Sequence, residues 1–284
     1  MKILITGASG QVGAELKDLL TDRKDVVAVF ADRNILPLED TLSIQQRLAK
    51  YSPDIIIHAG AYTAVDKAES EPELAGKVNH LATQEIARYC KQHGAKLIAI
   101  STDYVFDGNS SSPLTENATV NPINIYGETK LKGEEAIQAE CPEAIIIRTA
   151  WVYSTYGNNF VKTMLRLMTE REEIAVINDQ VGSPTYALDL AKAIMHIVDY
   201  PKWKAGIYHY SNTGEISWYD FALVIREVAG LDCKINAITS SEFPTAAKRP
   251  KFSLLDKSKI METFGLQIPF WKDSLRLMLE KCLK

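Results

Sequence analysis

Cysteine is scarce in this 284-residue sequence, and its four cysteines lie far apart at Cys90, Cys141, Cys233 and Cys282. None of them forms a Cys-x-x-Cys pair, so the sequence indicates neither a zinc site nor a disulfide framework, and the thiols are typical of a reducing compartment. No apolar run approaches the roughly 20 residues of a transmembrane helix, and no signal peptide is recognisable. We therefore expect a cytoplasmic protein.

An excess of positive charge is also missing, because 32 lysines and arginines stand against 36 aspartates and glutamates. The formal net charge of -4 argues against nucleic acid as the main partner. Hydrophobic residues, in contrast, make up 46% of the chain. That share suffices for one large core, or for one domain with a smaller lobe.

Short apolar runs alternate with amphipathic stretches through the first half of the chain. Continuous apolar runs are typical of strands covered on both faces, and the stretches between them have helical spacing. This repeat predicts an α/β fold with a doubly wound parallel sheet (a Rossmann fold), whose ligand crevice lies outside the carboxyl ends of the strands. Strands are predicted at 2–6, 26–30, 54–58, 96–101 and 144–148, and helices at 12–20, 44–50, 73–93 and 125–140.

Three glycines spaced three residues apart open the first predicted helix, in the stretch Gly7-Ala8-Ser9-Gly10-Gln11-Val12-Gly13. Glycine permits a tight turn and a close approach to a pyrophosphate, and the helix N-terminus offers unpaired N–H groups to the phosphates. Because the turn directly follows a strand, it predicts a dinucleotide site rather than an ordinary loop. Asp32, after the second strand, is spaced to bind the ribose of NAD, whereas Arg33 could face the 2′-phosphate of NADP. The choice between NADH and NADPH stays open.

The pattern loosens after residue 150, where proline and glycine are denser. Helices are predicted at 158–169, 188–198 and 218–229, and a strand at 206–210. We interpret residues 1–150 as an NAD(P)-binding Rossmann domain. Residues 151–284 are interpreted mainly as a smaller C-terminal substrate-binding lobe, with some segments returning to the Rossmann domain.

A tyrosine and a lysine lie one helical turn apart, in the stretch Tyr126-Gly127-Glu128-Thr129-Lys130. Residues i and i+4 share a helical face, so we expect the Lys130 ammonium to lower the pKa of the phenol toward the range of general acid–base catalysis. Ser101-Thr102-Asp103 ends the fourth strand, where such a sheet displays its active groups. Together these stretches predict an oxidoreductase in which Tyr126 donates a proton to a carbonyl oxygen and Lys130 also holds the nicotinamide ribose. Two alternatives remain. The Tyr-x-x-x-Lys spacing could arise by chance, and Ser101-Thr102 could simply cap a turn at the end of the strand.

These elements resemble those of the extended short-chain dehydrogenase/reductases, which act largely on nucleotide sugars. The resemblance implies that a dTDP-sugar is the substrate, and that NADPH or NADH reduces the C4 ketone of dTDP-4-dehydro-β-L-rhamnose to give dTDP-L-rhamnose for cell-surface polysaccharide. It spans nearly the whole chain, and the stretches that carry it are Ala61–Pro72, Ser101–Gly108, Tyr126–Lys130, Arg148–Tyr153, Asn158–Leu167, Ile177–Thr185 and Arg249-Pro250.

The resemblance also implies roles for single residues. Three of them match the catalytic trio of the family: Thr102, Tyr126 and Lys130. Its cofactor turn is matched by Gly10, Gln11 and Val12, and its nicotinamide-side loop by Ala61, Tyr62 and Thr63. Its adenine-binding positions are matched loosely by Glu39 and Asp40. Magnesium and a homodimer are possible by the same resemblance, although no cluster of metal ligands is recognisable.

Four residues are candidates for the sugar nucleotide: Asp103, Trp151, Asn159 and Arg249. Asp103 matches a position near the sugar, and Trp151 offers a flat apolar face to a sugar ring but could equally be a core aromatic. Arg249 could bind the diphosphate with its two nitrogens, or be a surface arginine before a proline. Asn159 could bind phosphate or sugar, or only cap the helix that starts there.

Two other kinds of function remain as alternatives. Sugar 4,6-dehydration in this fold uses a Thr-Asp-Glu pattern, whereas this chain reads Thr102-Asp103-Tyr104, which leaves dehydration without its second carboxylate. Another nucleotide-sugar reductase or an epimerase is compatible with the sequence. A non-catalytic, nucleotide-binding regulatory subunit similar to that of methionine adenosyltransferase would not need the complete trio found here.

Overall fold

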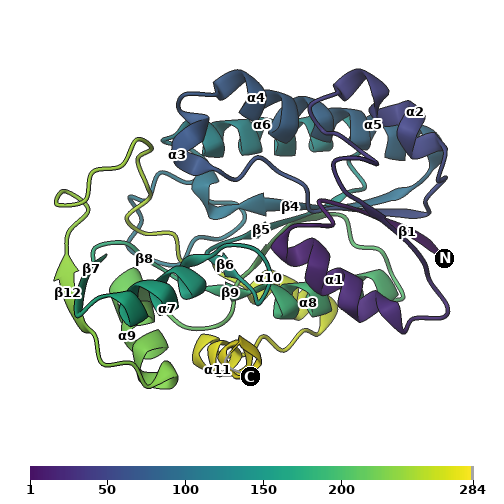
Figure 1. The fold of residues 1–284 in the computed structure, drawn as a ribbon. Helices are drawn as coiled ribbons and strands as arrows, with labels where there is room; N and C mark the ends of the chain where they lie inside the picture. Colours follow the sequence, from purple (N-terminus) through teal and green to yellow (C-terminus); the bar gives the residue numbers. More distant parts are fainter. Residues whose placement is uncertain (283–284) are drawn as a thin grey trace.

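Six parallel strands form the central sheet of the structure, a computed structural model that describes residues 1–282 (Figure 1). Their order is β10-β5-β4-β3-β1-β2, so the winding direction reverses between β1 and β3. Such a reversal places a crevice at the carboxyl ends of those two strands. The predicted doubly wound α/β fold is confirmed. The strands are β1 (Lys2–Thr6), β2 (Val27–Ala31), β3 (Ile55–His58), β4 (Lys96–Thr102), β5 (Ile145–Thr149) and β10 (Gly206–Tyr210).

Both faces of the sheet are covered by helices, which explains the unbroken apolar runs of the strands. In β1, Ile3 and Ile5 belong to one buried cluster and Leu4 to another on the opposite face. The first face is covered by α1 (Gln11–Thr21), α8 (Ala187–Asp199) and α10 (Ser258–Phe264). The second is covered by α2 (Ile44–Ala49), α5 (Ala82–His93) and α6 (Ile125–Glu140), and Figure 1 shows the two layers.

The long helix predicted over 73–93 is present and begins at Pro72, but a turn of π-helix lies within it. The chain forms α4 (Pro72–Gly76), a turn of π-helix at Lys77–Leu81, and then α5. Such a turn inserts one extra residue into a helix and is often found at functional sites. It directs the buried Asn79 toward α6, whereas Gly94 ends α5 in the left-handed conformation, as expected of a C-terminal glycine.

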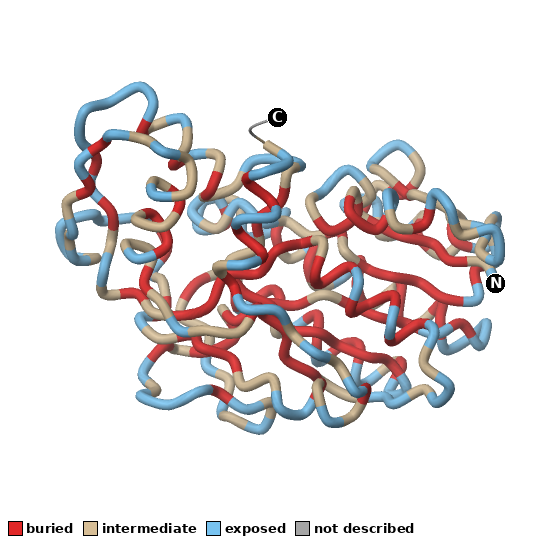
Figure 2. Tube along the Cα trace, turned by 90° about the horizontal axis from the view of Figure 1, so that it is seen from below, coloured by how far each residue is buried: buried red, intermediate tan, exposed pale blue. Residues whose placement is uncertain are grey.

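A second core lies in the C-terminal lobe, built from α7 (Phe160–Glu170), β7 (Glu173–Ile177), α9 (Trp218–Ala229), β12 (Lys234–Ile238) and α11 (Trp271–Cys282). β7 and β12 pair in parallel, and α8, β10 and α10 pack with the main sheet instead. Figure 2 shows both buried interiors inside an exposed rim. The short elements are α3 (Val65–Ala68), β6 (Val152–Tyr153), β8 (Val181–Gly182), β9 (Thr185–Tyr186), β11 (Ile216–Ser217) and the 3-10 turns Thr41–Ser43 and Asp103–Val105.

Over residues 1–282 there is no helix that combines the length and the apolar character needed to cross a membrane.

Candidate active site

The glycine turn lies at the reversal point of the sheet. Gly7 has a φ of 66°, and a Cβ added there would lie 2.6 Å from the backbone of Gly60, which follows β3. A Cβ on Gly13 would collide with the carbonyl oxygen of Gly7. Gly10 caps α1 without any side-chain hydrogen bond, so the first N–H groups of α1 stay available to an anion. The turn therefore has the form needed to receive a pyrophosphate.

A chain of neutral hydrogen bonds ties β1 to β3 beneath this turn. The N–H of Gly60 donates to Thr6 Oγ1 at 3.1 Å, and Thr6 Oγ1 lies 2.7 Å from His58 Nδ1. His58 Nε2 lies 3.1 Å from Thr83 Oγ1, whose hydroxyl donates to the carbonyl of Asn79 at 2.8 Å. This order of donors places the proton of the imidazole on Nε2. Burial lowers the pKa of His58 to about 3, so the ring is neutral.

Asn79 holds the loop predicted to face the nicotinamide. Its Oδ1 accepts from Tyr62 N at 2.8 Å, and its Nδ2 donates to Tyr62 O and to Thr129 Oγ1 at 3.1 Å each. The amide therefore joins the loop Ala61-Tyr62-Thr63 to α6, the helix of the tyrosine and lysine. The Tyr62 hydroxyl in turn donates to Glu71 at 2.7 Å.

Asp32 caps the loop that follows β2. Its Oδ1 accepts from Asn34 N at 2.9 Å and from Ile35 N at 3.1 Å, so this carboxylate is turned toward the backbone of its own loop. Arg33 is exposed, and within residues 1–282 its guanidinium has no hydrogen-bonded or ionic partner. Glu39 and Asp40 are exposed as well, and Asp40 lies 3.9 Å from Arg47.

Thr102 and Tyr126 flank the carboxyl end of β4. Thr102 ends the strand, and its hydroxyl donates to Asp103 at 3.1 Å and accepts from Tyr104 N at 3.2 Å. Asn124 caps α6 by accepting from Gly127 N at 2.8 Å, which starts the helix one residue before Tyr126.

The expected low pKa of the Tyr126 phenol is wrong. Burial raises its pKa to about 12, although the Thr102 hydroxyl acts in the opposite direction. The ammonium of Lys130 is directed elsewhere, because its Nζ donates to the carbonyl oxygen of Ile100 at 2.8 Å. Burial also lowers the pKa of Lys130 to about 8, whereas Glu134 acts to raise it. Because the pKa of Tyr126 lies far above 7, its phenol is protonated at neutral pH, as a proton donor must be.

Asp103 lies next to these groups and is buried. Its burial raises its pKa to about 6, against hydrogen bonds from Ser253 and Thr102. Among the described residues its Oδ2 has no hydrogen-bond partner. A buried, unsatisfied carboxylate oxygen beside the trio is suited to accept a hydroxyl of a bound sugar.

Trp151 follows β5 in an unusual backbone conformation. Its φ is 50°, in the left-handed region that a bulky residue rarely adopts. Its ring stacks on Trp218, the first residue of α9, with centroids 3.7 Å apart and an angle of 12° between the planes. Phe160 lies on Trp218 in turn, at 4.6 Å between centroids. Because Trp151 follows a strand of the main sheet and Trp218 begins a helix of the lobe, this aromatic stack joins the two parts. Trp151 itself is only partly buried.

Asn159 caps α7 and also contacts Gln11, next to the glycine turn. Its Oδ1 accepts from Lys162 N at 3.1 Å, and its Nδ2 donates to Gln11 Oε1 at 3.0 Å. Gln11 donates to Val152 O at 3.2 Å. The amide of Asn159 thus fixes the side chain of Gln11 against the segment that follows β5.

Arg249 is bound to Asp66, an acidic residue of α3. Its Nη1 and Nη2 donate to the two carboxylate oxygens of Asp66 at 3.1 and 2.6 Å, and Asp66 also accepts from Ala247 N at 3.1 Å. Tyr104 lies within reach of both Arg249 and Tyr126, whose ring it meets edge-on at 5.5 Å between centroids. Arg249 therefore belongs to the same cluster as the trio.

Several residues that shape the site were not recognised in the sequence. Their signal is polarity at buried positions: one apolar-faced helix carries Asn79, and strands rich in isoleucine end with His58 and carry Arg148. Within residues 1–282, no group of three or more His, Cys, Asp or Glu side chains is placed to hold a metal ion, so the magnesium suggested by resemblance has no ligand set here.

Comparisons with known proteins agree with this geometry. The family model of the RmlD substrate binding domain matches residues 1–284. The dTDP-4-dehydrorhamnose reductase of Escherichia coli (strain K12) is 42% identical over 292 residues, covering 99% of this chain and 98% of that protein. The crystal structure of the orthologue from Clostridium acetobutylicum ATCC 824 covers 100% of both chains at 40% identity, with a TM-score of 0.96. That of the Bacillus anthracis str. Ames enzyme in complex with NADP covers 99% of both chains at 40% identity, with a TM-score of 0.93. The chain therefore belongs to the dTDP-4-dehydrorhamnose reductase family of the extended short-chain dehydrogenase/reductases.

Proposed function

We propose that this protein reduces the C4 ketone of dTDP-4-dehydro-β-L-rhamnose with NADPH or NADH and releases dTDP-L-rhamnose. The observation that carries the proposal is the placement of Thr102 and Tyr126 at the carboxyl end of β4, in the sheet whose glycine turn can receive a pyrophosphate. The relatives named above are reductases, which disfavours the non-catalytic regulatory subunit. The second carboxylate that dehydration needs is replaced by Tyr104, which packs on Tyr126.

The residues divide the chemistry of carbonyl reduction between them. When bound, the reduced nicotinamide supplies the hydride to C4 of the sugar. The protonated Tyr126 phenol gives its proton to the oxygen, so the C=O bond becomes a CH–OH group and charge balances. The Thr102 hydroxyl would donate to the same oxygen and place it. Lys130, protonated below about pH 8, would hold the ribose of the cofactor and favour return of a proton to the phenol.

We propose that residues 1–150 hold the cofactor and that the remainder, apart from α8, β10 and α10, holds the sugar nucleotide. Asp103 would accept a sugar hydroxyl and Trp151 would cover the apolar face of the ring. Arg249 could reach the diphosphate only by exchanging at least part of its pairing with Asp66. Asn159 would act through Gln11. A homodimer and a cytoplasmic location stay predictions of the sequence.

Turnover of the dTDP-linked ketosugar tests the proposal directly. The purified protein, the ketosugar and either NADPH or NADH should give loss of cofactor absorbance and a product whose C4 configuration is that of L-rhamnose by NMR. Binding of NADPH without turnover would instead support the regulatory-subunit alternative.

Arg33→Ala should distinguish the two cofactors. The exposed guanidinium lies beside Asp32, whose carboxylate is held within its own loop, so Arg33 is placed to bind a 2′-phosphate. Loss of one charge-assisted hydrogen bond should raise the KM for NADPH about tenfold and leave the KM for NADH within about twofold. Arg166→Ala on α7, also an exposed arginine, is the matched control. An unchanged ratio of the two KM values in Arg33→Ala would remove this role.

A further inference from the structure

A buried ion pair lies behind the catalytic lysine. Glu134 follows Lys130 by one turn of α6, and Arg148 lies on β5; the side chains of Glu134 and Arg148 are each only 3% exposed. Arg148 Nε donates to both carboxylate oxygens, at 3.0 and 3.1 Å, and its Nη2 donates to Oε2 at 2.7 Å. Two guanidinium nitrogens on one carboxylate fix the orientation of the Glu134 side chain.

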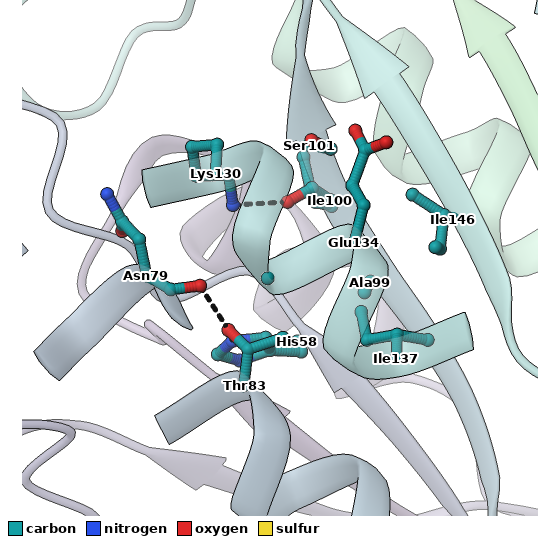
Figure 3. A pocket seen from close by; sticks show the side chains of 11 residues that line it. His58, Asn79, Thr83, Ala99, Ile100, Ser101, Lys130, Glu134, Ile137 and Ile146 are labelled. Carbon is teal, nitrogen blue, oxygen red and sulfur yellow. Dashed lines mark hydrogen bonds between the residues drawn. The ribbon is translucent and has the colours of Figure 1, made fainter. Parts of the chain in front are cut away.

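Glu134 and Lys130 also line one small cavity, shown in Figure 3. Of the residues lining it, Glu134 is the only acidic one and Lys130 the only basic one apart from the neutral His58. The cavity has room for about one water molecule. The Lys130 ammonium donates to the carbonyl oxygen of Ile100, another residue lining the cavity, at 2.8 Å. A neutral carbonyl cannot balance a buried positive charge, and within residues 1–282 the one charged group that acts to keep Lys130 protonated is the nearby carboxylate of Glu134.

We propose that Glu134 is a positioning residue of the reductase, and that its carboxylate, fixed by Arg148, keeps the Lys130 ammonium charged and in place under the cofactor site. The proposal rests on the proposed function for the role of Lys130. Without Glu134, burial would favour the neutral amine still further. Arg148 anchors the carboxylate to β5, so the helix that carries Tyr126 and Lys130 keeps its place against the sheet.

The other titratable groups around Lys130 do not replace this carboxylate. His58, on β3, is neutral because burial lowers its pKa to about 3. Tyr126, on the same helix, is protonated at neutral pH. Asp103, beyond the end of β4, lies beside Tyr126 and Thr102. The positive charge of Arg148 opposes that of Lys130, so its effect is of the wrong sign.

The sign of the pH dependence follows from these charges. Burial lowers the pKa of Lys130 to about 8, and the nearby carboxylate acts to raise it. The charged lysine binds the cofactor, so the affinity for NADPH has its full value below this pKa and falls as the pH rises through it. Removal of the carboxylate lowers the pKa further, and the fall in affinity then begins at lower pH.

The test is the dissociation constant of NADPH between pH 6 and 9.5, measured by quenching of tryptophan fluorescence in the ligand-free protein and its variants. In the parent, the constant should begin to rise near pH 8, the pKa of Lys130. In Glu134→Gln the rise should begin about one pH unit lower, which at pH 8 makes binding about fivefold weaker. Glu134→Gln/Arg148→Met removes both buried charges and folds without an unpaired guanidinium. It should shift the rise in the same direction by a smaller amount, because the loss of the Arg148 charge acts the other way.

Glu135→Gln is the matched control, because it makes the same change of charge at the exposed neighbouring position of α6. Its profile should coincide with that of the parent. An unshifted profile in either Glu134 variant, with cooperative thermal unfolding retained, overturns the inference. Cofactor binding needs no sugar, so a shifted profile without ketosugar turnover would reject the proposed function and leave the role of Glu134 intact.

Discussion

Tyr126→Phe should lower kcat for the ketosugar by about 100- to 10,000-fold, the range that a lost general acid produces. Phenylalanine keeps the ring, so its edge-on contact with Tyr104 persists. The hydroxyl is the only group removed, and the phenol is protonated at neutral pH because its burial raises its pKa to about 12. The NADPH dissociation constant should therefore stay within about twofold of the parent value. Steady-state turnover and fluorescence titration measure the two quantities.

The control for this variant is Tyr219→Phe on α9, which also removes one phenolic hydroxyl and should leave kcat unchanged. The assignment of the proton donor to Tyr126 would be wrong if Tyr126→Phe reduced the ketosugar at nearly the parent rate. A loss confined to KM would point to a role in binding the sugar instead.

Gly13→Ala should weaken NADPH binding by about 10- to 100-fold and lower the free energy of unfolding by about 1–3 kcal/mol. The added methyl group would collide with the carbonyl of Gly7 and lie 2.7 Å from Ala8 Cα, all of which is backbone. The start of α1 must then move away from the turn, and its N–H groups lose their aim at the pyrophosphate. Fluorescence titration and chemical denaturation measure the two effects.

Gly76→Ala provides a sharp contrast. Gly76 lies at the end of α4, and a Cβ built there meets no atom within 4 Å. Alanine should leave binding unchanged and stabilise the helix by about 0.5–1 kcal/mol. If Gly13→Ala bound NADPH as tightly as Gly76→Ala, the cofactor turn would lie somewhere other than residues 7–13.

Residues with local signals were predictable from the sequence. The helices of 125–140 and 218–229 and the strand of 206–210 have the predicted bounds, because each begins or ends at a strong local cue such as the capping residues Asn124 and Ser217. The glycine turn was recognisable because its spacing is local, and so was the pair Tyr126 and Lys130. The direction of the pKa shift of Tyr126 was not, since it depends on how deeply the phenol is buried.

Features that join distant segments were out of reach. Glu134 and Arg148 belong to different elements, and neither has a sequence neighbour that reveals the other. The stack of Trp151 on Trp218 requires the lobe to fold back onto β5. The π-helical turn at Lys77–Leu81 is invisible in a period of 3.6 residues, because one inserted residue leaves the apolar face nearly continuous.

The hydrogen-bonded histidine between β1 and β3 makes the folded state labile in mild acid. Burial lowers the pKa of His58 and of His209 from 6.5 to about 3. As the pH falls below 6.5, the unfolded chain takes up a proton at each imidazole that the native one refuses. Each histidine then lowers the free energy of unfolding by about 1.4 kcal/mol for every pH unit, until the native rings titrate as well. The free energy of unfolding is therefore expected to be highest above pH 6.5 and to decline as the pH falls toward 3.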